Sequence, residues 1–178
     1  MARSAPVLIA LLLFGAAGCG DRGLPTSPFS HEDAPVLMSA SEYVLEAGSR
    51  GWRGELEFTY QNVTNRTISL LNCRGGFAYR LEKWTEEGWI TAWAPVLLMC
   101  LSPPIRIAPG GEHEHVAGIF GGYPGGNTYP RFSVDEVDGI YRVVIDGAYW
   151  NYDHDGPSWG NLPPEPYRVS APFRIRTN

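Results

Sequence analysis

Residues 168–176 have the sequence RVSAPFRIR, in which apolar and polar residues alternate. The apolar set is Val169, Ala171, Phe173 and Ile175, and the polar set is Arg168, Ser170, Arg174 and Arg176. Because successive side chains of a strand point to opposite faces of its sheet, we expect the first set to face a core and the second to face water. The stretch therefore predicts a half-buried β-strand.

The same alternation recurs along the chain. Its apolar members are Leu56, Phe58 and Tyr60, then Phe77, Tyr79 and Leu81, then Tyr141, Val143 and Ile145. Further strands are expected at about residues 67–70, 89–93, 105–107 and 112–118, with turns at Glu86-Glu87-Gly88 and Pro109-Gly110-Gly111. No helix of convincing length is indicated. About seven to nine short strands separated by turns predict an all-β fold, an antiparallel β-sandwich.

A local motif points to a more specific sandwich. Residues 138–143, DGIYRV, resemble the start of strand F in immunoglobulin domains, although Gly139 sits one place early and Val143 replaces the cysteine. More broadly, residues 43–176 resemble bacterial Ig-like domains of uncharacterised lipoproteins and, distantly, the Bacillus-type intracellular proteinase inhibitor fold. The segments that carry this resemblance are ELEFTYQN, RLEKWTEEGW, IAPGG, GIYRVVI and FRI. It implies an Ig-like topology in which Tyr141 is buried and its hydroxyl bonds to nearby upstream backbone.

The N-terminal sequence is typical of an export signal. Arg3 precedes the apolar residues 6–14, and Ala16-Ala17-Gly18 places small residues directly before Cys19. The apolar stretch is about a dozen residues, too short for a helix across roughly 30 Å of bilayer. A cysteine at the cleavage point resembles the bacterial lipobox, which implies a signal peptide at residues 1–18 and lipid on the Cys19 thiol. The protein is then held in the cell envelope, on the outer membrane or a periplasmic face if the cell has two membranes.

The rest of the chain divides into two parts. Residues 19–40 are rich in Pro, Ser, Gly and charge, which predicts a flexible tether. Residues 41–178 are then the β-sandwich domain. Two cysteines remain, Cys73 and Cys100, and in an oxidising compartment they most simply form a disulfide. The alternative is a pair of free thiols.

Composition excludes some functions. The chain has 14 basic and 19 acidic residues, a net charge of −5, which argues against nucleic acid as a partner because such binding needs clustered Lys and Arg. The sequence has no G-x-S-x-G elbow and no phosphate loop, and its cysteines are assigned elsewhere. We therefore expect no catalytic residues, no cofactor and no enzymatic activity.

Three groups of residues are candidates for binding. His113 and His115 lie two apart on an expected strand and share a face, so they could hold zinc or copper, or simply line a polar solvent face. Asn151, Asp153 and Asp155 mimic the start of a calcium loop, but the twelfth position is Leu162, and a polar hairpin tip is the alternative. Aromatic residues gather in the same region and could bind sugars or a protein, or only pack. They are Tyr149, Trp150, Tyr152 and Trp159, with Tyr123 and Tyr129 in a Gly-rich loop.

The leading hypothesis is a non-enzymatic, membrane-anchored lipoprotein whose Ig-like domain binds a protein or envelope component, such as a glycan, through its loops. Alternatives are a proteinase inhibitor, on fold resemblance alone, and a metal-binding module that uses the histidine pair or the Asp-rich loop.

The anchor hypothesis makes a direct prediction. Cys19→Ser removes the thiol that would carry the lipid, so metabolic labelling with a radioactive or clickable fatty acid should be lost and the protein should be unprocessed or soluble. Labelling of the variant at the wild-type level would contradict lipidation at Cys19.

Overall fold

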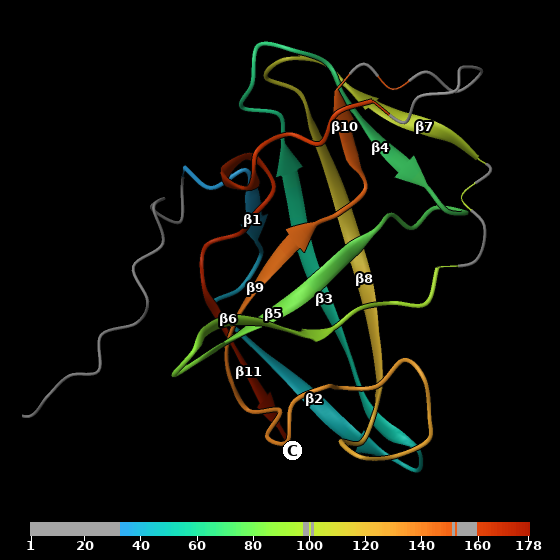
Figure 1. The fold of residues 1–178 in the computed structure, drawn as a ribbon, viewed down its shortest axis with the longest axis vertical. Coiled ribbons are helices and arrows are strands. Elements are labelled where there is room, and N and C mark those ends of the chain that lie inside the picture. Colours follow the sequence, from blue (N-terminus) through green and yellow to red (C-terminus); the bar gives the residue numbers. More distant parts are fainter. Residues whose placement is uncertain (1–32, 98–99, 101, 151, 153–159) are drawn as a thin grey trace, which may run out of the picture.

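The computed structural model describes residues 33–97, 100, 102–150, 152 and 160–178 (Figure 1). This part of the chain is an all-β sandwich, as the alternation predicts. Its strands are β1 (Val36–Met38), β2 (Glu42–Gly48), β3 (Gly51–Gln61), β4 (Ile68–Asn72), β5 (Tyr79–Thr85), β6 (Gly88–Trp93), β7 (Ser102–Ile107), β8 (Glu112–Gly122), β9 (Gly139–Ile145), β10 (Ala148–Trp150) and β11 (Phe173–Thr177). The helical element is a single 3-10 turn, η1 (Glu165–Tyr167). Within the described residues, no helix is long and apolar enough to cross a membrane.

The strands form two layers that share one strand. In the first layer, β3 pairs with β8 along its whole length and with β1 on its other side. The second layer has the order β11–β9–β5–β6. Residues 42–45 of β2 pair with β11, whereas residues 46–48 pair with β3, so β2 passes from one layer to the other. A smaller sheet, β10–β4–β7, lies at the upper end of Figure 1.

The core fills the space between the layers with apolar and aromatic side chains. Phe58 of β3 lies 5.9 Å from Tyr79 of β5 between ring centroids, and His115 of β8 lies 6.1 Å from the same ring. Leu56, Leu81 and Ile175 are fully buried. The predicted apolar face of the C-terminal stretch is confirmed, since Val169, Ala171, Phe173 and Ile175 are all at most 3 % exposed.

Three features differ from the sequence prediction. The described residues contain eleven strands rather than seven to nine, because β1, β2 and β10 form where the sequence pattern located no strand. The β2–β11 pair is parallel, whereas antiparallel pairing was expected throughout. The fold also begins earlier than residue 41: Ala34 is fully buried and β1 pairs with β3, so the end of the predicted tether belongs to the sandwich.

Ser170 was expected to face water, and this is wrong. It is 2 % exposed and lies between two chain segments, with a bridge to Val36. Its amide donates to the Val143 carbonyl at 3.0 Å, and its Oγ accepts from the Val143 amide at 2.9 Å. The hydroxyl thus satisfies a backbone donor of β9, which is why a polar residue is tolerated inside.

The prediction for Tyr141 is confirmed. The side chain is fully buried, and its hydroxyl donates to the Val137 carbonyl at 2.5 Å, four residues upstream. The predicted disulfide is also present: Cys73 and Cys100 are bonded. It joins the end of β4 to the segment before β7, next to the pair Asn72–Ser102. The Cα atoms of the two cysteines lie 3.9 Å apart, closer than the usual range of about 4.4–6.8 Å.

The Tyr141 bond can be tested by removing one oxygen atom. Tyr141→Phe leaves the buried Val137 carbonyl without its partner, so the free energy of unfolding should fall by about 1–2 kcal/mol in urea titrations. Tyr129→Phe is the matched control, because Tyr129 is 66 % exposed, and it should change stability by less than about 0.5 kcal/mol. Equal stability of Tyr141→Phe and wild type would contradict this role of the hydroxyl.

Candidate functional site

The turn between β3 and β4 is held in place by one buried side chain. Asn62 is 1 % exposed, and its Nδ2 donates to the Arg66 carbonyl at 2.7 Å and to the Ile107 carbonyl at 2.9 Å. Its Oδ1 accepts from the Thr64 amide at 3.1 Å. These bonds fix a turn at residues 62–65, and its backbone presents the Arg66 side chain at one end of the sandwich.

Arg66 stands over an aromatic pair. Its guanidinium lies 5.2 Å from the centre of the Trp150 ring, and the Trp150 ring lies 6.4 Å from that of Tyr167. The backbone of Tyr167 is held in place by the Tyr60 hydroxyl, which donates to the Tyr167 carbonyl at 3.0 Å. Trp150 is fixed by backbone hydrogen bonds with Asn161 in both directions.

Two shallow clefts meet at Arg66. The first has a volume of about 420 Å³ and is lined by Val63, Thr64, Asn65, Arg66, Trp150 and Tyr167. The second, also about 420 Å³, is lined by Arg66, Thr67, Ser69, Arg106 and Tyr152. We call Arg66, Arg106, Trp150, Tyr152 and Tyr167 the loop-end surface. It combines two guanidinium groups with three aromatic rings, and no carboxylate lines either cleft in the described residues.

The loop-end surface contains an unpaired donor. The Trp150 Nε1 atom is buried and has no hydrogen-bond partner within the described structure. Buried polar atoms are nearly always paired, because an unmade bond costs about 1–3 kcal/mol. For an acceptor on a bound molecule to pair with this donor, the indole edge has to turn outward, and the guanidinium over the ring then favours an anionic acceptor.

The predicted aromatic group is only partly assembled. Tyr149 and Tyr152 lie together, with 6.1 Å between ring centroids, and Trp150 is on the same strand as Tyr149. Trp159 lies outside the described residues, as do Asn151, Asp153 and Asp155 of the possible calcium loop. Tyr123 packs instead against Trp52 at 5.2 Å and donates to the Gly48 carbonyl at 2.7 Å. Tyr129 is exposed, with the Arg131 guanidinium over its ring at 5.0 Å.

The histidine pair is half-buried and lies against Phe77, on the opposite face of β8 from the exposed Glu112 and Glu114. Phe77 lies 4.3 Å from the His115 ring and 6.0 Å from the His113 ring. Burial lowers the pKa of His115, and the neighbouring His113 lowers it further. The polar solvent face that was the alternative for this pair is therefore wrong. In the described part of the chain, no three His, Cys, Asp or Glu side chains are placed to hold a metal ion.

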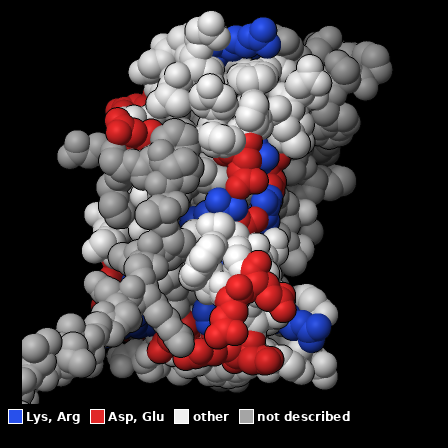
Figure 2. All heavy atoms as spheres, turned by 60° about the vertical axis from the view of Figure 1, so that its left-hand side comes forward, with Lys and Arg blue, Asp and Glu red and all other residues white. Residues whose placement is uncertain are grey.

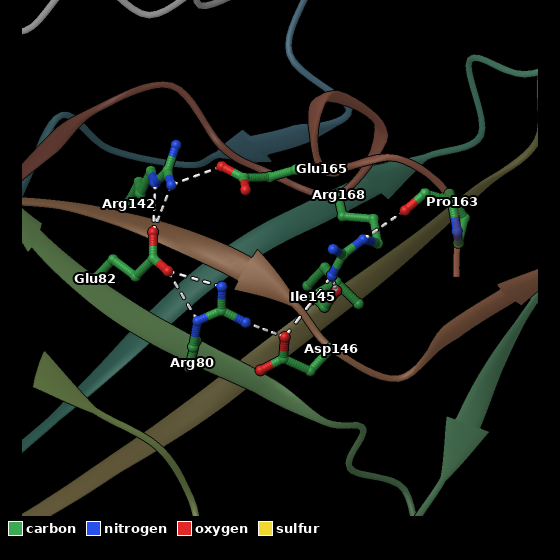
Figure 3. Close-up of polar contacts among 8 residues, drawn as sticks. All are labelled: Arg80, Glu82, Arg142, Ile145, Asp146, Pro163, Glu165 and Arg168. Atoms are coloured by element: carbon green, nitrogen blue, oxygen red, sulfur yellow. Dashed lines mark hydrogen bonds and ion pairs between the residues drawn. The ribbon is translucent and has the colours of Figure 1, made fainter. Parts of the chain in front are cut away.

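An ion-pair network, which sequence reasoning missed, lies on the outer side of β5 and β9 (Figure 3). Glu82 accepts from Arg80 at 2.7 Å and from Arg142 at 2.6 Å, and Arg142 also pairs with Glu165 of η1 at 2.7 Å. Asp146 contacts Arg80, and Figure 2 shows basic and acidic side chains alternating across the middle of one side of the molecule.

The arginines and carboxylates of the network offset one another's charges. Burial raises the pKa of Asp146, and the nearby Arg80 and Arg168 oppose this. Arg168 also donates to the carbonyls of Ile145 and Pro163 at 2.7 and 2.8 Å, which ties the segment around η1 to β9. The alternation places Arg80 and Glu82 on one face, but the direct pairing of Glu82 with Arg142 depends on strand register. Each carboxylate here is already paired, so the network ties β5, β9 and η1 to one another.

The network predicts a stability difference between two glutamates. Glu82→Gln leaves Arg80 and Arg142 without their shared carboxylate, whose side chain is 8 % exposed, so the free energy of unfolding should fall by about 1.5–3 kcal/mol. Glu42→Gln is the control, since its pair with Arg176 is exposed at 43 % and 62 % and such pairs contribute about 0–1 kcal/mol. Chemical denaturation of both variants measures the effect. Equal losses would show that the network adds nothing beyond surface charge.

Comparisons with known proteins do not assign a family. No protein-family model matches the sequence, and no curated protein is significantly similar to it. Two solved structures are weakly similar to the chain. One is the Pseudomonas fluorescens alkylpurine DNA glycosylase AlkC bound to DNA with an abasic site analog, at 15 % identity and TM-score 0.34, covering 81 % of this chain and 31 % of that one. The other is a β-glucosidase from Listeria innocua in complex with gluconolactone, at 14 % identity and TM-score 0.31, covering 79 % and 15 %. The chain spans less than a third of either protein, and likenesses this weak carry no argument about function.

Proposed function

We propose that the chain is an exported lipoprotein, anchored through Cys19, whose domain is a non-enzymatic binding module. In this proposal, the loop-end surface binds an anionic glycan of the cell envelope. The observation that carries the proposal is the Arg66 guanidinium over the ring of Trp150, whose buried Nε1 atom has no partner in the described structure. An acceptor on a ligand would satisfy the indole donor, and a carboxylate would also neutralise the cation.

The rest of the surface fits the same class of ligand. Aromatic rings with a polar edge provide apolar contact area and hydrogen bonds together, which suits a sugar ring with its hydroxyl groups. Trp150, Tyr152 and Tyr167 provide the rings, while Arg106 lines the second cleft. A cationic patch on a chain of net charge −5 is a local reversal of charge, and it selects for an anion over other envelope components.

Cosedimentation with protease-treated peptidoglycan sacculi, which carry carboxylates, tests the proposal. The lipidated protein in detergent should bind, and Arg66→Gln and Trp150→Phe should each weaken binding about tenfold, or ~1.4 kcal/mol. Trp150→Phe keeps an aromatic ring but removes the indole donor and part of the ring surface. Arg174→Gln, an exposed arginine on β11, is the control and should bind like wild type.

Two outcomes would contradict the proposal. One is wild-type binding by both loop-end variants. The other is binding to untreated envelopes that protease digestion abolishes, because the ligand would then be a protein.

A further inference from the structure

The outer edge of β8 has no strand beside it for most of its length. β8 pairs with β3 over residues 112–122 without a register shift, and this is its only strand partner in the described residues (Figure 1). In an antiparallel pair, the amide and carbonyl of one residue point to the same side, and those of its neighbours point to the opposite side. The direction of any one residue therefore fixes the direction of every second residue along β8.

Contacts at the end of β8 give that direction. The Gly122 amide donates to the Pro130 carbonyl, its carbonyl accepts from Phe132, and the Phe120 carbonyl accepts from the Trp93 indole. These groups therefore point away from β3. By the alternation, the amides and carbonyls of Glu112, Glu114, Val116 and Gly118 also point to the open edge. No hydrogen bond to them is formed within the described chain.

Gly118 lies on the same open part of β8. It is exposed, its backbone needs no positive φ, and a Cβ atom added to it would meet nothing within 4 Å. By contrast, a Cβ on Gly54 or Gly121 would collide with Leu45 or Phe132 at 2.5 and 2.4 Å. The fold therefore does not require glycine at 118, and a glycine inside a strand often marks a place where another backbone approaches closely.

We propose that the free edge of β8 accepts an extended basic segment of a partner protein as an added strand. Backbone hydrogen bonds to the open amides and carbonyls would supply affinity, as in other cases of strand addition. The outward side chains near this edge are acidic, with Glu112 and Glu114 on β8 and Glu55 and Glu57 on β3. Arg53 is the single arginine or lysine on the two strands, and its guanidinium lies 5.6 Å from the centre of the Phe120 ring.

The outward side chains of β8 determine which residues the added strand should have at each position. Side chains directly opposite each other on one face lie about 5 Å apart, and opposite charges there attract. Basic residues are therefore expected beside Glu112 and Glu114, an apolar residue beside Val116, which is 57 % exposed, and a large ring over Gly118. Val116 and Gly118 also line hollows of about 660 and 540 Å³, which extend on this face across β3 towards β1 and β2.

The test uses two labelled peptides, Lys-Thr-Lys-Thr-Val-Thr-Trp and its reverse, with the full chain in detergent. One of the two should bind in fluorescence anisotropy, and replacing its lysines by glutamates should abolish binding. Val116→Pro removes an amide that faces the open edge and is tolerated there by the fold, so it should weaken binding at least tenfold. Val116→Thr and Arg66→Gln are controls and should change binding less than about twofold.

Several results would overturn the proposal. One is that neither peptide binds at millimolar concentration, and another is that the acidic peptide binds as tightly as the basic one. A third is that the Val116→Pro variant has the melting temperature of the wild type and also binds the peptide with wild-type affinity. If the protein is a dimer that Val116→Pro dissociates, the edge serves a second copy instead. Because Arg66 lies in the loop-end surface, Arg66→Gln separates a failure of this proposal from a failure of the glycan proposal.

Discussion

The burial of one aromatic cluster between the two layers organises the molecule. A sheet with one apolar face must cover that face, and here Phe58 of the first layer meets Phe77 and Tyr79 of the second at ring distances of 5.9 Å. His115 joins the same cluster, so a titratable side chain is held inside, and its pKa is lowered by burial. The position of each outward residue follows from this packing, since a one-residue shift of any strand would turn its apolar side chains to water.

Fixed connections at the ends complete the sandwich. Tyr141 ties the start of β9 to Val137, the disulfide ties β4 to the approach of β7, and Asn62 ties its own turn to Ile107. Each uses a buried or covalent bond where backbone pairing ends. Side chains at these ends are therefore held on a rigid frame, which is what a preorganised binding surface requires. The loop-end surface and the edge of β8 differ in this respect, because the first presents side chains and the second presents backbone.

Sequence patterns predicted the parts of the structure that repeat regularly. The alternation at β3, β5, β9 and β11 predicted the core residues, and the tyrosine motif predicted the Tyr141 bond. Short pieces escaped because three residues, as in β1 or β10, give no readable period. The prediction that Ser170 faces water was wrong because the alternation takes the outward face of a strand to be open. In the structure, Ser170 lies between β9 and Val36 and is covered by both.

The sequence predicted a group of aromatic residues at the candidate site, but not most of the residues that form it. Trp150 and Tyr152 were singled out from their sequence neighbourhood, but Arg66, Arg106 and Tyr167 come from distant segments and meet them only through the fold. The ion-pair network depends likewise on the register that sets Glu82 opposite Arg142. Long-range pairing of this kind has no local signal in a single sequence.

The indole N–H signal of Trp150 in a proton–nitrogen NMR spectrum reports directly on whether the loop-end surface binds an anionic glycan. The chain has six tryptophans, so the other indoles serve as internal references, and Trp150→Phe assigns the signal. On titration with soluble, protein-free peptidoglycan fragments, the Trp150 signal should move downfield and saturate as its donor gains an acceptor. A Trp150 signal that stays in place while the fragments bind elsewhere, or while no signal moves at millimolar concentration, would contradict the proposed site.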